Sequence, residues 1–487
     1  MKKLILALLI LTIFAGCAFA LEPAKGDETL KTSDILSLVK KYPIPDMQTG
    51  ALKFAEPDPS MLAKWWEAFN DPTLTELIEY ALKNSRDLNI ARSKVIASRA
   101  GLAASRARFL PWFSGFGSYQ RGRNSQDTYP DAQGAVSNVY SLGVDASWEI
   151  DLFGGRSADT RAAKANVQAQ YAQLYNAWVS LSAEIAMQYI TLRTSQYSLA
   201  VAQDNYKLQE QTYQLVSSRH QAGLIDELAL KQAKYSMEKV KALIPPFKIT
   251  VEETKNRLAL LVGKIPGELE EKLNGDVNIP FASGGVLYGI PANMLRQRPD
   301  IQAAERNLAA AFAKRQSAQA DLWPKLYLNG TIGTEALTGD GLFTAATRNF
   351  GFGPALKLPI FQWGAIKSNI IVQTEAEKQA LYAYEKTVLN AIAEVRNALE
   401  SSVQKRERTQ SLKDGFEAAK AALEIAEDKY KAGLVTFDPV INAQESLRAL
   451  SQAYVISRGE VSISTIQLFK ALGGGWQPID EELAKKK

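Results

Sequence analysis

The residue types that most often carry protein chemistry are scarce in this sequence of 487 residues. Cys17 is the only cysteine and His220 the only histidine. A zinc site usually takes several Cys or His ligands, and a His-based triad needs a nucleophile beside its histidine. We therefore expect no metal, no cofactor and no catalysis, and we interpret His220 as a solvated helix residue.

Cys17 lies at the end of an amino-terminal leader. Lys2 and Lys3 precede an apolar run at positions 4–15, and small residues follow, which is the pattern of a secretory signal peptide. The apolar run is too short to span a bilayer as a helix.

Two cleavage sites compete within this leader. Ala15-Gly16-Cys17 matches the site at which bacterial lipoproteins are cut and acylated, although Phe14 stands where Leu is usual. Ala18-Phe19-Ala20 satisfies the ordinary small-x-small rule and would release a chain that begins at Leu21. We expect lipidation of Cys17, because a lone cysteine has no disulfide partner within the chain.

Charge and hydropathy exclude two further classes of protein. The formal net charge is +5, from 57 Lys and Arg against 52 Asp and Glu, and the basic residues form no cluster of the kind that binds nucleic acid. No later stretch reaches the 18 or so consecutive apolar residues that a membrane-spanning helix needs.

A duplication organises the rest of the chain. Asp87-Leu88 recurs as Asp300-Ile301 at an offset of 213, and Ala222-Gly223-Leu224 recurs as Ala432-Gly433-Leu434 at an offset of 210. Such fixed offsets indicate that one unit of roughly 200 residues occurs twice.

Each unit contains two segments in which apolar residues alternate with small or polar ones. In the clearest, apolar residues occupy the even positions from Tyr140 to Ile150, and the odd positions include Ser141, Asp145, Ser147 and Glu149. A period of two is typical of a strand with two different faces. The expected strands are 112–120, 139–150, 326–333 and 349–360.

Each unit also contains a very long helix with a coiled-coil seam. The stretch 156–222 has neither Gly nor Pro, and the corresponding long helix of the second unit is expected over 365–432. Apolar residues recur there at spacings of three and four, and at 1.5 Å per residue such a helix is a rod of about 100 Å. The seam residues are Leu174, Trp178, Leu181, Ile185, Tyr189 and Leu192, then Leu381, Tyr384, Val388, Ile392, Val395 and Leu399. The other expected helices are 87–109, 226–262 with an interruption at Pro245-Pro246, 300–322 and 436–472.

Four two-faced strands cannot close into a barrel alone. An open sheet in lipid would leave the backbone groups of its edges unpaired, so closure needs several chains. Two chains would give eight strands with a filled interior, whereas three give twelve and a water-filled one. The polar positions Ser141, Asp145, Ser147 and Glu149 favour the second, with these side chains in the lumen.

At this point the chain resembles the trimeric outer-membrane efflux ducts of the TolC and OprM type, in particular their NodT-like lipoprotein branch. Arg298-Pro299-Asp300-Ile301, followed by Ala303-Ala304-Glu305, is the most specific motif. The matching strings are WWEAFNDPTLTELIEYAL (65–82), SWEIDLFGG (147–155), IPPFKITVEETKNRLALLVG (244–263), IPANMLRQRPDIQAAERNLAAAFA (290–313) and AGLVTFDPVINAQESL (432–447).

The resemblance implies a mainly α fold with a membrane β-barrel. Three copies would share a twelve-stranded barrel, four strands from each chain, above a periplasmic coiled-coil α-barrel. It also implies a homotrimer in the outer membrane that docks to a periplasmic adaptor protein and an inner-membrane pump, most often of the RND type. The absence of Asp after Cys17 implies sorting of the lipoprotein to the outer membrane. Function would be passive, since the pump supplies the energy.

The resemblance also implies a gate at the periplasmic end. The family has a carboxylate nine residues after the last tip glycine, and three copies of it constrict the pore. Counting from Gly433 gives Asn442, which keeps the size of the carboxylate but not its charge. Asp438, four residues earlier, could supply a displaced ring, or it could only cap the helix beside Pro439.

The triplets Ala222-Gly223-Leu224 and Ala432-Gly433-Leu434 mark the helical tips. Gly after a helix is explained by backbone geometry alone, but the Leu that follows it in both units is not. In the family these tips meet the helical hairpin of the adaptor. We expect both roles together, and we expect Trp65-Trp66 to pack in the belt around the helices.

These patterns divide the chain into five parts. They are a signal peptide (1–16), an anchor and extended segment (17–64), a first repeat (65–275), a second repeat (276–473) and a polar tail (474–487). Two alternatives to an efflux duct are the related duct of a type I protein secretion system and a periplasmic coiled-coil scaffold protein. A scaffold would not need the alternating strands.

Overall fold

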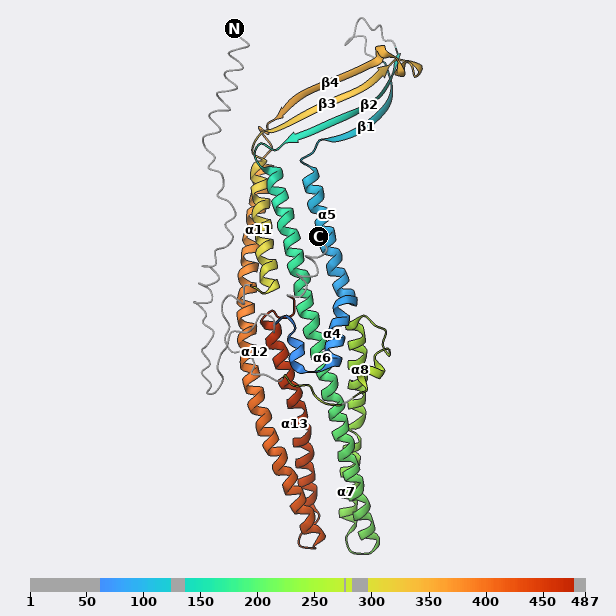
Figure 1. Ribbon diagram of the computed structural model, residues 1–487, viewed down its shortest axis with the longest axis vertical. Coiled ribbons are helices and arrows are strands. Elements are labelled where there is room, and N and C mark those ends of the chain that lie inside the picture. Colours follow the sequence, from blue (N-terminus) through green and yellow to red (C-terminus); the bar gives the residue numbers. More distant parts are fainter. Residues whose placement is uncertain (1–61, 124–135, 276, 283–296, 477–487) are drawn as a thin grey trace. The chain divides into compact units, whose positions relative to one another are not determined.

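The computed structural model describes residues 62–123, 136–275, 277–282 and 297–476 (Figure 1). The signal peptide, Cys17 and most of the anchor segment lie outside these residues. The elements are η1 (Trp65–Phe69), α4 (Pro72–Asn84), α5 (Arg86–Ala107), β1 (Trp112–Arg123), β2 (Val136–Ile150), α6 (Gly155–Gln221), α7 (Glu227–Lys241), α8 (Ile244–Val262), α9 (Glu270–Leu273), α11 (Pro299–Ala320), β3 (Lys325–Ala336), η3 (Asp340–Phe343), η4 (Ala345–Thr347), β4 (Arg348–Lys357), α12 (Ala365–Lys431) and α13 (Asp438–Ala471).

The four strands form one antiparallel sheet in the order β1-β2-β3-β4. All four strands predicted from the alternation are present, and the first three are longer than predicted. The fourth is shorter, because it ends at Lys357 and not at residue 360. In the pairing register Leu358 would lie opposite Pro324, which precedes β3 and has no backbone N–H, so the ladder stops at Lys357.

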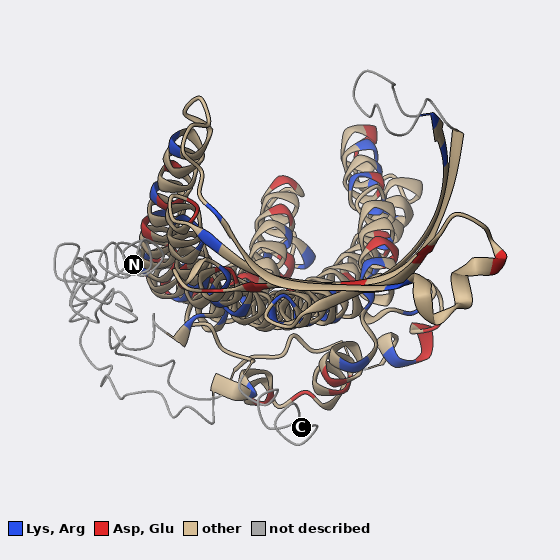
Figure 2. Cartoon of the chain, turned by 90° about the horizontal axis from the view of Figure 1, so that it is seen from above, with Lys and Arg blue, Asp and Glu red and all other residues tan. Residues whose placement is uncertain are grey.

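The pairing register gives the sheet one apolar and one polar face. Paired residues project to the same side, and Val144, for example, lies opposite Ile332, which lies opposite Phe350. The same rule assigns the apolar face the residues Phe113, Tyr119, Tyr140, Leu142, Val144, Ala146, Trp148, Ile150, Leu326, Leu328, Ile332, Phe350, Phe352, Pro354 and Leu356. Seen from above, the sheet is a curved band with few charges, while Lys, Arg, Asp and Glu lie mainly on the helices (Figure 2).

The two long helices confirm the coiled-coil prediction. α6 and α12 each contain 67 residues and differ from the predicted bounds by one residue at most at each end. Every predicted seam residue of α6 is buried, as are Tyr384, Val388, Ile392 and Val395 in α12. Leu381 and Leu399, the remaining two seam residues of α12, are half-buried.

The return helices differ between the two halves of the chain. α13 runs without a break for 34 residues, while the first return is divided into α7 and α8. The break falls at Ala242 and Leu243, and Pro245 and Pro246 lie in the first turn of α8, where proline is tolerated. The predicted interruption is therefore present, three residues earlier than the prolines.

A belt of short elements packs against α6 and the end of α13. Trp65 and Trp66 are almost fully buried, and the ring of Trp65 stacks on Phe469 of α13 at 5.5 Å, which confirms their packing role. Asp71 caps α4 by accepting a hydrogen bond from the backbone N–H of Leu74, and it also accepts one from the Tyr189 hydroxyl at 2.8 Å. Burial raises the pKa of Tyr189 to about 12.

Arg298 joins three helices at the same level. It is 6 % exposed, and it donates to Asp300 at the start of α11, to Glu394 of α12 at 2.7 Å and to the carbonyl of Ala471 at the end of α13 at 2.7 Å. A buried guanidinium needs such partners, and these contacts account for the Arg-Pro-Asp motif in the sequence.

None of the helices in the described residues has the length and apolar character needed to cross a membrane.

Candidate functional site

The predicted lumen residues lie together on the polar face of the sheet. Ser141, Asp145, Ser147 and Glu149 pair in register with Glu335, Thr331, Asn329 and Tyr327 of β3. The Ser147 hydroxyl donates to the Asn329 amide oxygen at 2.8 Å, which shows that the two side chains share this face. The polar face can therefore contact water while the other face contacts hydrocarbon.

An aromatic ring also lies on the polar face, which the alternation did not reveal. Phe116 pairs with Gly143, and its ring covers that glycine. A Cβ at Gly143 would come within 2.7 Å of both the Phe116 ring and the carbonyl oxygen of Ile332. The close approach of the strands thus requires glycine at position 143.

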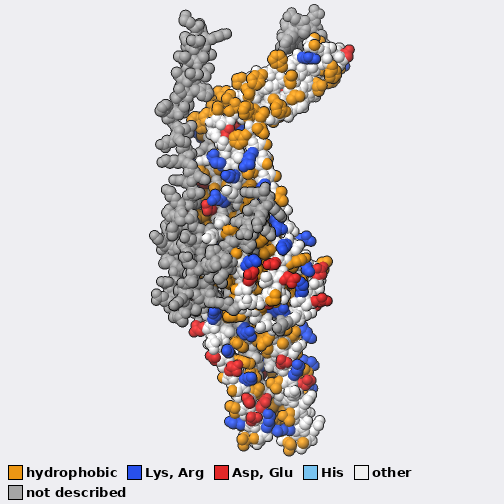
Figure 3. All heavy atoms as spheres, viewed as in Figure 1, with side chains coloured by type: hydrophobic (Ala, Val, Ile, Leu, Met, Phe, Trp, Pro, Cys, Tyr) orange, Lys and Arg blue, Asp and Glu red, His pale blue; other side chains and the backbone are white. Residues whose placement is uncertain are grey.

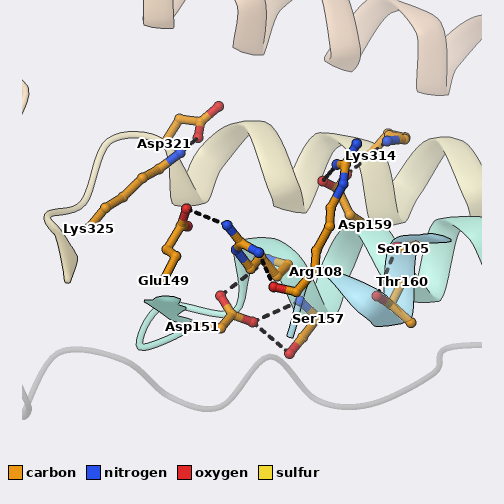
Figure 4. A network of polar contacts seen from close by, with 11 residues as sticks. Ser105, Arg108, Glu149, Asp151, Ser157, Asp159, Thr160, Lys314, Asp321 and Lys325 are labelled. Carbon is orange, nitrogen blue, oxygen red and sulfur yellow. Dashed lines mark hydrogen bonds and ion pairs between the residues drawn. The ribbon is translucent and has the colours of Figure 1, made fainter. Parts of the chain in front are cut away.

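The end of β2 is tied to the start of α6 by Asp151. Its two carboxylate oxygens accept hydrogen bonds from the backbone N–H groups of Arg156 (3.1 Å) and Ser157 (2.8 Å) and from the Ser157 hydroxyl (2.8 Å) (Figure 4). These N–H groups belong to the first turn of α6 and have no partner within the helix. Asp151 therefore sets the angle at which the chain leaves the sheet.

Arg156 extends this network to α5. Its guanidinium donates to Glu149 at 2.7 Å and to the backbone carbonyl of Arg108, just after the end of α5. The side chains of Arg156 and Glu149 are 24 % and 16 % exposed, so this pair is better protected from solvent than a typical surface ion pair. Glu149, which the alternation predicts in the lumen, is thus also a structural residue, which its place in the alternation did not indicate.

The end of α11 and the start of β3 complete the same junction. Lys325 donates to Asp321 at 2.7 Å, and Lys314 donates to Asp159 of α6 at 2.8 Å (Figure 4). A cavity of about 510 Å³ lies here on the polar side of the sheet, lined by residues of α5, α6, α11, β2 and β3. Its charged side chains form ion pairs or, in the case of Asp151, bond to the first turn of α6, which suits a rigid neck between sheet and helices better than a ligand site.

Both predicted tips have the same backbone structure. Gly223 and Gly433 have φ angles of 72° and 74°, in the left-handed region that favours glycine. The N–H groups of Leu224 and Leu434 each bond to a carbonyl five residues back, which is the Schellman arrangement. Their side chains are 72 % and 74 % exposed. Ala222 and Ala432 are exposed beside them, and His220 is half-buried.

The predicted gate residues lie on the first turns of α13. Asn442 and Asp438 are both exposed, on the side opposite Val440 and Gln444, which are buried against the other helices. The capping interpretation of Asp438 is wrong, because α13 begins at Asp438 itself and has no side-chain cap at its start. Asp438 acts on the helix only through the favourable position of a negative charge in its first turn.

The structure adds a buried polar contact that sequence reasoning missed. The Gln209 amide of α6 donates to Gln444 at 3.0 Å, and the Gln444 amide donates to Thr212 at 3.1 Å. Gln209 and Gln444 are 6 % and 3 % exposed. A polar residue at a seam position was the available signal, since Val440 and Gln444 are four residues apart on one face.

Two further contacts connect α7 with α13 and α6 with α12. Lys239 of α7 donates to Glu445 of α13 at 2.6 Å, and this hydrogen bond lowers the pKa of the Glu445 carboxyl. The guanidinium of Arg219 lies 4.7 Å from the ring centroid of Tyr430, close to the tips. Together with the shared apolar cluster around Val216 and Phe437, these contacts join the α6–α7 hairpin to the α12–α13 hairpin.

Comparison with known proteins gives a consistent match. Residues 77–264 and 290–474 match the sequence model of the family described as outer membrane efflux protein. The chain is 30% identical over 420 residues to the solvent efflux pump outer membrane protein SrpC of Pseudomonas putida, covering 85% of this chain and 88% of that protein. It is 30% identical over 423 residues to nodulation protein T of Rhizobium leguminosarum bv. trifolii, with 85% and 88% covered.

A solved structure of the outer-membrane channel OprN has the same fold. It aligns with a TM-score of 0.82 and 32% sequence identity, over 89% of this chain and 98% of the OprN chain. The match extends over both the sheet and the long helices, because nearly the whole OprN chain is covered.

Proposed function

The chain belongs to the outer membrane efflux protein family, as the outer-membrane channel of an efflux system, and we propose that three copies of it form a passive duct. The duct receives substrates from a periplasmic adaptor protein and an inner-membrane pump, of the RND type, and leads them across the outer membrane. The pump supplies the energy, and the duct supplies a continuous aqueous path.

The two-faced sheet is the observation that supports this duct most directly. One face is apolar and the other polar, and β1 and β4 form its edges. Unpaired edges are costly in lipid, so each β4 needs the β1 of another copy as its partner. Twelve strands enclose an aqueous pore, with Ser141, Asp145 and Ser147 facing it.

The oligomeric state tests this proposal. In mild detergent the purified protein is expected to run as a trimer in size-exclusion chromatography with light scattering. A folded monomer that is stable in detergent or in vesicles would contradict it, because four strands would then satisfy their edges alone.

We propose further that the start of α13 forms the constriction of the closed duct. Asn442 and Asp438 are exposed on one side of α13, away from the apolar cluster that joins the two hairpins, so neither is committed to packing within its own chain. Three copies of these side chains would surround the pore axis. Contacts of Gln444 with Gln209 and of Glu445 with Lys239 would hold α13 in the closed position.

The tips are the proposed contact with the adaptor. Two Schellman turns of the same geometry each expose one leucine, Leu224 and Leu434, so a trimer offers six similar apolar contacts. A helical hairpin of the adaptor could insert its own apolar residues between them. Loss of adaptor binding in Leu224→Ser and Leu434→Ser variants, with trimer formation unchanged, would support this role.

We propose that Cys17 carries a lipid that anchors the amino terminus. Mass spectrometry of the mature protein is expected to find a chain that begins at Cys17 with added acyl mass, which Cys17→Ser abolishes. A mature chain that begins at Leu21 would contradict lipidation and identify Ala18-Phe19-Ala20 as the cleavage site.

A further inference from the structure

The turn between β4 and α12 exposes an unusual number of apolar side chains. Leu358, Ile360, Phe361 and Trp363, here called the turn patch, are 52 %, 89 %, 71 % and 89 % exposed. The rings of Phe361 and Trp363 lie 4.8 Å apart at 60° to each other, so they form a pair. Hydrophobic side chains gather over the sheet and its base, where the sheet meets the helices (Figure 3).

The backbone of this turn is strained at Trp363. Its φ angle is 52°, in the left-handed region, and Gly364 follows with a φ angle of 84°. Among the described residues, Asn70 is the other non-glycine with a positive φ, and asparagine tolerates this region whereas a bulky residue rarely adopts it. Strain of this kind persists where the position of the side chain matters.

The first repeat supplies an internal control for the turn patch. At the offset of 210, Phe153 corresponds to Trp363 and Asp151 to Phe361. Gly154 has the same left-handed conformation as Gly364, yet Phe153 is half-buried and stacks on Trp323 at 5.3 Å. The first turn thus directs Phe153 to Trp323 and Asp151 to the start of α6 and exposes only Leu152 (51 %), while the second exposes both of its aromatic rings.

The turn patch continues the apolar face of the sheet. Phe350, Phe352 and Leu356 of β4 are 87 %, 76 % and 55 % exposed on that face, and the patch follows directly after the strand. An outer-membrane channel buries this face in hydrocarbon, and aromatic residues favour the boundary between hydrocarbon and headgroups. Lys367 is exposed in the first turn of α12, where its ammonium group suits lipid phosphates.

We propose that the turn patch is a lipid anchor, which inserts Phe361 and Trp363 into the headgroup boundary on the periplasmic side of the membrane. The strained backbone at Trp363 holds the indole outward for this contact. In the first repeat, Asp151 caps α6 instead, and that turn faces the neck of the duct. The anchor would set how deep the sheet sits in the bilayer, and it rests on the outer-membrane location and not on the gate.

Depth-dependent fluorescence quenching tests the anchor. Cys17→Ser removes the only cysteine, so Trp363→Cys can carry a single environment-sensitive fluorophore in the full-length trimer. The protein is placed in phosphatidylcholine and phosphatidylglycerol vesicles that contain lipids with a nitroxide either at the headgroup or deep in the acyl chain. The label is expected to lose more fluorescence to the headgroup nitroxide than to the deep one.

Two matched positions make the result decisive. Phe352→Cys, in the middle of β4, should be quenched more by the deep nitroxide. Leu434→Cys, at a tip and as exposed as Phe352 (74 % and 76 %), should respond only to aqueous iodide. If the label at position 352 is quenched by the deep nitroxide while the label at position 363 is quenched by iodide alone, the turn patch lies in water and the anchor is refuted. If neither lipid nor iodide reaches it, a second copy or a partner covers the patch, which also refutes the anchor.

Failure of the membrane placement itself would look different. Phe352→Cys would then also escape the lipid nitroxides, which would contradict the duct and not only the anchor. Should Trp363→Cys not assemble as a trimer, Phe361→Cys labels the other ring of the pair and is expected to give the same depth.

Discussion

The buried contact between Gln209 and Gln444 gives the sharpest test of how the periplasmic end stays closed. Gln444→Leu keeps the size of the side chain but removes the acceptor of the Gln209 amide, which donates to it at 3.0 Å. Gln209 is 6 % exposed, so water cannot readily replace the lost partner. Thr212 still has the carbonyl of Leu208 as its acceptor, at 3.0 Å.

The expected loss of stability follows from the side-chain amide of Gln209, which is the donor that loses its acceptor in Gln444→Leu. Leaving a buried amide unsatisfied costs about 1–3 kcal/mol, whereas replacing both partners by apolar groups of similar shape is nearly neutral. Gln444→Leu should therefore weaken the contact between the hairpins by about 1–3 kcal/mol, and Gln209→Leu with Gln444→Leu should recover most of it. If this contact favours the closed duct, the single variant raises the open population about 5- to 150-fold per chain.

Conductance of single trimers in a planar bilayer measures the open population, and thermal unfolding in detergent measures the loss of stability. Gln467→Leu is the control, because Gln467 lies on the same helix and is exposed. The expected order of open probability is Gln444→Leu above the double variant, with the double variant and the control near wild type. An unchanged open probability in Gln444→Leu, at a measurable loss of stability, would show that the contact is structural and does not hold the gate. Failure of the double variant to recover would contradict the assignment of the cost to an unsatisfied amide.

Three further predictions concern other contacts. Arg298→Leu removes the buried cation that bonds to Asp300, Glu394 and the Ala471 carbonyl, so the free energy of unfolding of the trimer should fall by about 3 kcal/mol. An unchanged melting temperature would contradict the role of Arg298 as the link between α11, α12 and α13. The hydrogen bond from Lys239 holds the pKa of the Glu445 carboxyl below its ordinary value of 4.5, so this contact stabilises the fold fully above pH 4.5 and less as the pH falls below that value. The decrease of the melting temperature in acid should therefore be smaller in Glu445→Gln than in wild type. Identical pH profiles of the melting temperature would refute a stabilising contact between Lys239 and Glu445. Asn442→Asp should introduce three facing carboxylates that raise one another's pKa and strengthen the block of the channel by divalent cations. Asp438→Asn should reduce this block only if Asp438 lines the pore. If neither variant changes the conductance or the block, the constriction lies elsewhere.

The strands and long helices could be predicted because their patterns are local and long. The two-residue period from Tyr140 to Ile150 and the seam from Leu174 to Leu192 depend on neighbours along the chain, and both were recovered with small errors at the ends. The end of the last strand was missed, since the apolar alternation continues through Leu358 and Ile360 while the partner strand β3 begins only at Lys325, opposite Lys357.

The polar contacts could not be predicted, because they join residues far apart in the sequence. In the sequence, Glu149 is only one of the polar residues at the odd positions of a strand. Its pairing with Arg156 depends on how the chain turns between the two residues. Gln209 and Gln444 are separated by 235 positions, and only the packing of α6 against α13 brings them together. The capping role expected for Asp438 failed for a related reason, since the start of α13 is set by Phe437 and Val440 in the apolar cluster between the hairpins.

The two halves of the chain keep one backbone plan but use it for different tasks. In the first half Asp151 of the strand-to-helix turn caps α6 and Phe153 is half-buried, and the return helix is broken at Ala242 and Leu243. In the second half the turn is apolar and exposed, and α13 is continuous from the proposed gate to the Arg298 site at its far end. The unbroken α13 therefore links the Gln444 contact to the Arg298 site through one helix, whereas the break between α7 and α8 divides the return helix of the first half.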